Sequence, residues 1–175
     1  MNEKEVNHLS NQLKRVYSAN KTSERPFNLF FTNLQEDGLI NRTCCAKVDG
    51  FRSYIINFKE NPVTELFDSK DLVYLSPDAE NTLQNLDPKK VYVIGGLVDD
   101  SVKSQVSLNL CQSLNLQCYK LPIDEFMERG ETGTYKQILT INQIFEILLK
   151  FYETADWKQA LAAGVPPRTG FIIKQ

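Results

Sequence analysis

The sequence lacks the glycine-rich motifs that mark the common nucleotide-binding folds. No GxGxxG and no GxxxxGK[ST] occurs in the 175 residues, which speaks against a Rossmann dinucleotide site and against a P-loop. The chain has a single histidine, His8, and four cysteines without a CxxC pair. A zinc site is therefore not expected. We expect no metal and no nicotinamide cofactor.

Long apolar runs and an excess of one charge are also missing. No stretch approaches the ~18 uninterrupted apolar residues of a membrane span, and the polar start MNEKEVNHLS does not resemble a signal peptide. The net charge of −2 gives no overall field that attracts nucleic acid. We expect reduced thiols, no membrane, and a location in the cytoplasm or nucleus.

What the sequence does contain is typical of one soluble globular domain spanning residues 1–175. Hydrophobic residues make up 42% and charged residues 24%. Apolar residues at helical spacing predict helices over Glu5–Asn20, Ala79–Leu86 and Ile141–Glu153. Two more helices are expected, with Ser107 and Asp156 as N-caps and Gly164 ending the second. Strands are expected over 27–34, 53–58, 71–76, 90–96 and 117–122, a flexible loop over 127–135, and an extended tail from Pro166.

Strands that alternate with helices, several of them apolar on both faces, predict a parallel α/β sheet flanked by helices. Ligands of such sheets bind at the carboxyl ends of the strands. The loops after Leu75, Ile94 and Leu121 carry Gly, Pro or acidic residues, and they end three of the expected strands. The candidate site is therefore the edge that these loops form.

The stretch VYVIGGLVDD (91–100) combines a buried strand, two glycines and two acids. Gly95 and Gly96 suit either a plain tight turn or a bare backbone beside a cofactor. Asp99 and Asp100 suit either a solvated surface or a general base at the site. The residues alone leave both alternatives open.

Polar residues elsewhere are open to two readings as well. Asn142 and Gln143, in the first turn of the long helix, could be exposed capping residues or ligand contacts. Four basic residues on the first helix and its exit could be a solvated face or a phosphate-binding edge. These are Lys14, Arg15, Lys21 and Arg25.

Seven motifs in series resemble one family. They are QLKRVYSANK (12–21), DLVYLSPDAENTL (71–83), VYVIGGLVDD (91–100), LPIDEF (121–126), ILTINQIFEILL (138–149), DWKQAL (156–161) and PPRTGF (166–171). Together they resemble the catalytic domain of the tRNA position-9 purine N1-methyltransferases, the Trm-ten family, a branch of the SPOUT class. The RGETGTY loop and GLVDDS resemble the animal B-type paralogue most.

The resemblance implies the SPOUT methyltransferase fold, with a C-terminal trefoil knot whose loops hold S-adenosyl-L-methionine. Such a knot is an exception to the usual connection rules, so periodicity could not reveal it. By resemblance the cofactor contacts are Leu75, Gly95, Asp99, Asp100, Ser101, Val102, Lys103, Ser107, Leu121, Gln137, Ile138 and Leu139.

The resemblance also implies that Asp99 is the catalytic base that removes the N1 proton of guanosine 9 in tRNA. RNA contacts are expected at Lys14, Arg15, Lys21, Arg25, Lys103 and Asn142. The family's basic extensions are almost absent and Thr169 follows Arg168, so we expect a trimmed catalytic domain, and a monomer. Two alternatives stay open, namely a non-catalytic tRNA-binding scaffold subunit and a dual guanine/adenine enzyme.

Overall fold

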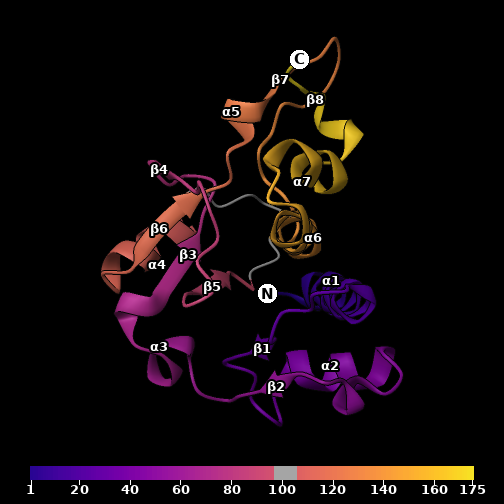
Figure 1. The fold of residues 1–175 in the computed structure, drawn as a ribbon. Coiled ribbons are helices and arrows are strands. Elements are labelled where there is room, and N and C mark those ends of the chain that lie inside the picture. Colours follow the sequence, from indigo (N-terminus) through magenta and orange to yellow (C-terminus); the bar gives the residue numbers. More distant parts are fainter. Residues whose placement is uncertain (97–105) are drawn as a thin grey trace.

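The computed structural model describes residues 1–96 and 106–175, and its centre is a four-stranded parallel sheet with strand order β4-β6-β3-β5 (Figure 1). The strands are β3 (Leu72–Leu75), β4 (Asn81–Thr82), β5 (Val91–Ile94) and β6 (Gln117–Lys120). Leu75 pairs with Ile94 on one side and with Tyr119 on the other. The expected parallel α/β sheet is confirmed, and the carboxyl ends of β3, β5 and β6 meet at one edge.

Helices cover both faces of this sheet. Neighbouring side chains along a strand point to opposite faces, so one strand contacts helices on both sides. Val73 and Leu75 pack into the main hydrophobic core with α6 (Ile141–Thr154) and α7 (Trp157–Gly164). The hydroxyl of Tyr74 faces α4 (Val106–Ser113) on the other side. Figure 1 shows α4 and α6 on opposite sides of β3. Within the described ranges, no helix is long and apolar enough to cross a membrane.

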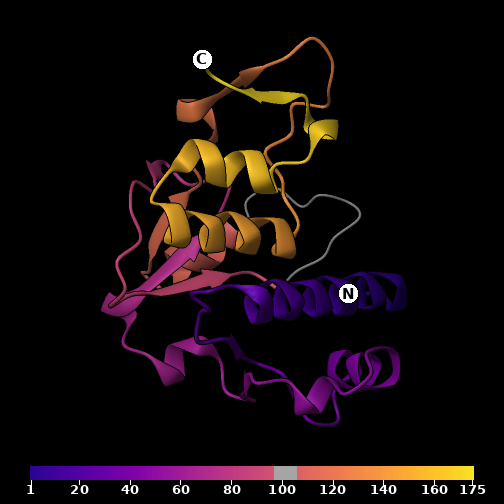
Figure 2. The ribbon, with the colours of Figure 1, turned by 45° about the vertical axis from the view of Figure 1, so that its right-hand side comes forward.

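The N-terminal third packs beside α6. α1 (Glu3–Thr22) lies between α6 and α2 (Leu39–Lys47), as Figure 2 shows. Its buried Val16 shares a cluster with Phe145 and Leu149 of α6. A separate two-stranded parallel sheet joins β1 (Phe30–Phe31) to β2 (Asn57–Phe58). The short helical turns are η1 (Phe51–Ser53), α3 (Val63–Leu66) and η2 (Ser69–Asp71).

The C-terminal part forms a small antiparallel sheet of β7 (Met127–Arg129) and β8 (Phe171–Ile173). α5 (Ile123–Phe126) precedes β7, and η3 (Pro167–Thr169) precedes β8. The flexible loop expected over 127–135 and the extended tail are therefore partly wrong. Each segment supplies the other with a hydrogen-bonding partner that sequence periodicity does not reveal.

The helix expected over Ala79–Leu86 is wrong. Asn81 and Thr82 form β4 beside β6, and the N–H of Leu83 donates to the carbonyl of Lys120 at 2.9 Å. The indole of Trp157 donates to the carbonyl of Gln84 at 2.7 Å. Tertiary partners thus hold the segment extended, against its local helical pattern.

All five expected strands are shorter than predicted, and the first two differ most. Only Phe30–Phe31 of the stretch 27–34 is a strand, and Asn33 has a φ of 55°, which a strand cannot contain. Only Asn57–Phe58 of the stretch 53–58 pairs, because the chain before it turns as η1. The sequence also gave no signal that predicted α2.

One expected helix end is confirmed and one expected cap differs. α7 ends at Gly164, as predicted, and a Cβ there would lie 2.3 Å from Ile147 Cγ1. The glycine is needed for close packing of α7 on α6. Ser107 lies inside α4 and not before it. Asp156 is the predicted N-cap, and hydrogen bonds from Gln159 lower the pKa of its carboxyl.

Candidate functional site

Three of the predicted cofactor contacts meet at the carboxyl edge of the sheet. Leu75 ends β3, Gly95 follows β5 directly, and Leu121 follows β6 directly. The N–H of Ser76 donates to the carbonyl of Tyr119 at 3.0 Å, which keeps β3 and β6 paired up to this edge. Leu75 is buried and Leu121 packs against the same core cluster. The structure therefore brings these residues together as predicted.

Gly95 lies against a tyrosine that the sequence analysis did not identify. A Cβ built on Gly95 would lie 2.8 Å from the Tyr74 hydroxyl and 3.4 Å from Ser107 Oγ. The Ser107 side chain hydrogen-bonds Tyr74, and both face the same point. Burial raises the pKa of Tyr74, and the bond from Ser107 acts against that rise. Close approach to Tyr74 is thus a sufficient reason for glycine at position 95.

Nothing in the sequence pattern singles out Tyr74. It is one of seven tyrosines, and it sits inside an apolar strand. Its meeting with Gly95 depends on the register of β3 against β5, in which Tyr74 pairs with Val93. Strand alternation then places Tyr74, Val93 and Gly95 on one face. Only the tertiary structure supplies that register.

The predicted contacts Gln137, Ile138 and Leu139 form the approach to α6. Leu139 packs against the main core, where Ile94 and Leu121 also pack. Ile138 is 48% exposed, and Gln137 Nε2 donates to the carboxylate of Asp124. This segment and the edge of the sheet thus share one hydrophobic support, while Ile138 presents apolar surface outward.

The first turn of α6 is held by side chains from two elements. Gln12 of α1 accepts the N–H of Ile141 at 2.9 Å, and Gln143 accepts the N–H of Thr140 at 2.9 Å. Asn142 is buried and accepts the Thr140 hydroxyl at 3.0 Å. Of the two alternatives for Asn142, an exposed capping residue is therefore excluded. The carboxamide oxygen of Asn142 thus has a partner within the chain. Its contact with RNA stays a prediction.

The basic residues of the predicted RNA edge lie on the surface. Lys14, Arg15 and Lys21 are exposed on α1, away from the side that packs on α6. Arg25 is tied to α6, because its guanidinium lies 4.5 Å from the centroid of the Tyr152 ring and donates to the Tyr152 carbonyl at 3.3 Å. The first three suit phosphate contacts better than Arg25 does.

The predicted contacts Asp99, Asp100, Ser101, Val102 and Lys103 lie outside the described residues. Within residues 1–96 and 106–175, no group of three or more His, Cys, Asp or Glu side chains could hold a metal. The four cysteines are free, and burial raises the pKa of Cys44 to about 11. For Cys118, burial and then the neighbouring Cys111 raise the pKa to about 12.

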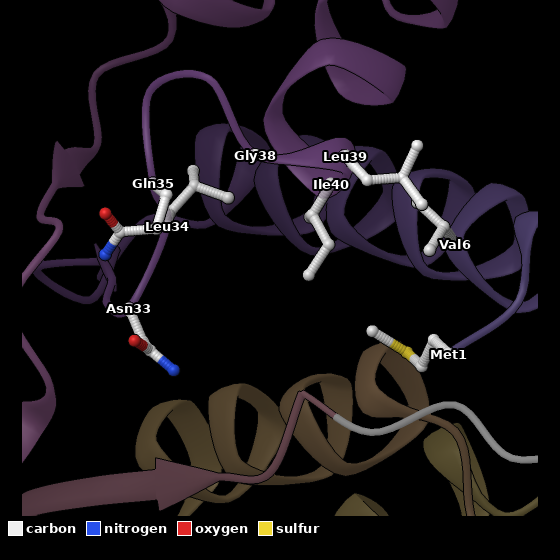
Figure 3. A pocket seen from close by; sticks show the side chains of 8 residues that line it. All are labelled: Met1, Val6, Asn33, Leu34, Gln35, Gly38, Leu39 and Ile40. Atoms are coloured by element: carbon white, nitrogen blue, oxygen red, sulfur yellow. The ribbon is translucent and has the colours of Figure 1, made fainter.

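A cavity of about 230 Å³ lies between the start of α1 and the start of α2. Figure 3 shows the side chains that line it. Met1, Val6, Leu39 and Ile40 give it a mainly apolar lining. None of the predicted site residues lines it. The cavity is therefore separate from the edge of the sheet.

Comparison with known proteins relates the whole chain to one family. The family model described as tRNA (guanine(9)-N(1))-methyltransferase TRM10/TRM10A matches residues 1–170. The tRNA methyltransferase 10 homolog B of Danio rerio is 41% identical over 97% of this chain. The tRNA (guanine(9)-N1)-methyltransferase of Schizosaccharomyces pombe is 38% identical over 99% of it. The chain spans only 56% and 57% of the lengths of these two relatives.

A solved structure has the same fold. The crystal structure of full-length spTrm10 in complex with SAH superposes with a TM-score of 0.83 at 36% identity, over 95% of this chain and 88% of that one. Although the family model carries the A-type name, relatives named homolog B are 36–41% identical to this chain, against 31–32% for relatives named homolog A. The predicted likeness to the B-type paralogue is confirmed.

Proposed function

We propose that this chain, which belongs to the TRM10/TRM10A family of tRNA (guanine(9)-N(1))-methyltransferases, transfers a methyl group from S-adenosyl-L-methionine to N1 of guanosine 9 in tRNA. The observation that carries the proposal is the likeness in sequence and fold, over nearly the whole chain, to a structure that contains SAH. SAH is what remains of S-adenosylmethionine after the methyl group has left. The cofactor is therefore proposed for this chain on the same ground.

The cofactor would bind at the carboxyl edge of the sheet. Leu75, Gly95 and Leu121 meet there, and Leu139 rests on the same core. Methyl transfer from a sulfonium depends on positioning and on exclusion of water rather than on a metal. An edge supported from below by a packed core suits that requirement.

The chemistry at guanine needs a base. The N1 electron pair attacks the methyl carbon, the carbon–sulfur bond breaks, and its electron pair remains on sulfur as SAH forms. The N1 proton has to leave, and we assign its removal to the carboxylate of Asp99. Adenine N1 carries no proton, so adenosine 9 would need Asp99 less.

Recognition of tRNA requires exposure of a base inside the folded core, at the cost of unstacking it. The exposed Lys14, Arg15 and Lys21 of α1 are proposed as phosphate contacts. Arg25, Lys103 and Asn142 are proposed as further RNA contacts. We further propose a monomer that carries the SPOUT trefoil knot. What supports the knot is the likeness of the fold to the spTrm10 structure.

The test is transfer of labelled methyl groups to two tRNA transcripts that differ only in guanosine or adenosine at position 9. Label on the guanosine transcript alone supports the proposal. Label on both supports the dual-specificity alternative. No label, with cofactor binding intact, supports either the scaffold alternative or a need for segments that the longer relatives carry, and the same assay with those segments added decides between the two.

Asp99→Asn gives the test of the base. We expect cofactor affinity to be kept and the rate on guanosine 9 to fall about 10²-fold, the lower range for a lost general base. Any rate on adenosine 9 should change little. Equal rates for the variant and the wild type between pH 6 and 8 would refute the role of Asp99.

A further inference from the structure

The hydroxyl of Tyr74 occupies a point between two elements that the proposed function uses. It lies 2.8 Å from where a Cβ on Gly95 would be, and Ser107 Oγ lies 3.4 Å from the same position. Gly95 follows β5, and Ser107 lies in the first turn of α4. Three elements, β3, β5 and α4, therefore meet at one phenolic oxygen.

The environment of Tyr74 fixes its ring. The residue is 6% exposed and lies in the central part of the sheet, with β5 on one side and β6 on the other. Its hydroxyl is hydrogen-bonded by Ser107. A rigid ring in a paired strand, with a bonded hydroxyl at its end, holds its neighbours at a fixed spacing, because well-packed side chains stay in one rotamer.

We propose that Tyr74 is a positioning residue for S-adenosylmethionine, which sets the spacing between the Gly95 backbone and the Ser107 side chain at the carboxyl edge of the sheet. This inference rests on the proposed function, since Gly95 and Ser107 are the predicted cofactor contacts through which Tyr74 acts. We assign Tyr74 no contact with the reacting atoms. Its contribution is the geometry of groups that do bind.

Tyr92 supplies a matched control on the opposite face of the same sheet. Its hydroxyl accepts the N–H of Asp87 at 2.7 Å, near the start of β5. Its ring packs against the main core, and burial raises its pKa as it does for Tyr74. Tyr92→Phe thus removes one bonded phenolic hydroxyl without touching Gly95 or Ser107.

The experiment compares Tyr74→Phe, Tyr92→Phe and the wild type in calorimetric titrations with S-adenosylmethionine and in steady-state kinetics. We expect Tyr74→Phe to weaken cofactor binding about five- to tenfold, the equivalent of one hydrogen bond. KM for S-adenosylmethionine should rise by a similar factor while kcat changes less than about twofold, since positioning of this kind is uniform binding. Tyr92→Phe should leave both constants unchanged.

Two outcomes would overturn the inference while the proposed function stands. One is wild-type affinity in Tyr74→Phe, and the other is an equal loss in Tyr92→Phe. A wild-type chain that does not bind the cofactor would instead overturn the proposed function. In that case a double-mutant cycle of Tyr74→Phe with Ser107→Ala tests the contact between the two side chains by itself. Additive losses of unfolding free energy would exclude coupling between the two hydroxyls.

Discussion

Substitution of Gly95 by alanine tests the packing at the carboxyl edge most directly. The added Cβ would lie 2.8 Å from the Tyr74 hydroxyl oxygen, which is closer than nonbonded atoms tolerate. Tyr74 is held within the sheet and cannot swing away without loss of packing. Forcing extra atoms into a packed site costs about 1–3 kcal/mol of unfolding free energy. We expect Gly95→Ala to lose about 2 kcal/mol.

The same geometry predicts that a second substitution restores most of this loss. In Tyr74→Phe the hydroxyl is absent, and the nearest atom of the ring, Cζ, lies 3.7 Å from the new Cβ, an ordinary van der Waals distance. Ser107 Oγ remains at 3.4 Å. In the Tyr74→Phe background we therefore expect Gly95→Ala to cost less than about 0.5 kcal/mol. The coupling between the two positions should be about 1.5 kcal/mol, within the range found for residues in contact.

Urea unfolding of the four proteins measures this cycle. With an m-value of about 2 kcal/mol/M, a loss of about 2 kcal/mol lowers the midpoint by about 1 M. Gly96→Ala is the control, because a Cβ there meets nothing within 4 Å. Equal costs of Gly95→Ala in the wild-type and Tyr74→Phe backgrounds would refute the argument, since the clash would then not involve the hydroxyl.

Two further predictions concern packing and pH. Gly164→Ala should destabilise the chain by about 2–3 kcal/mol or more. The new Cβ would lie 2.3 Å from Ile147 Cγ1 and 2.9 Å from the carbonyl oxygen of Gln143. A urea midpoint like that of the wild type would contradict this close packing of α6 and α7. Burial raises the pKa of the Cys44 thiol to about 11, and burial with Cys111 raises that of Cys118 to about 12, so the folded chain keeps protons that the unfolded chain, with a thiol pKa of 9.0, has lost. The free energy of unfolding should therefore be unaffected by these thiols below pH 9 and should fall as the pH rises above 9. A Cys44→Ala, Cys118→Ala variant should show a shallower fall in urea midpoint between pH 9 and 10.5. An unchanged slope would count against the raised pKa values of the two thiols.

Much of the candidate site follows from local sequence. The strand before Gly95 was predictable from its apolar, β-branched composition, and Thr140 marked the start of α6. The alternation of strands and helices predicted the parallel sheet, and hence the edge at which Leu75, Gly95 and Leu121 meet. These features follow from side-chain periodicity and capping, which act over a few residues. The family resemblance added the cofactor and the role of Asp99.

What local sequence did not determine depends on partners distant in the chain. The stretch 79–86 has a helical pattern, yet its amides pair with β6 and Trp157 binds its backbone. Gly164 resembles a helix stop, yet Ile147 is the reason for its lack of a side chain. Tyr74 acquires its place beside Gly95 and Ser107 only through strand register and the docking of α4. The sequence thus determined the strands and the long helix that frame the site, and the tertiary structure decided the remaining elements and which residues meet, because contacts between distant segments are set by packing of the whole chain.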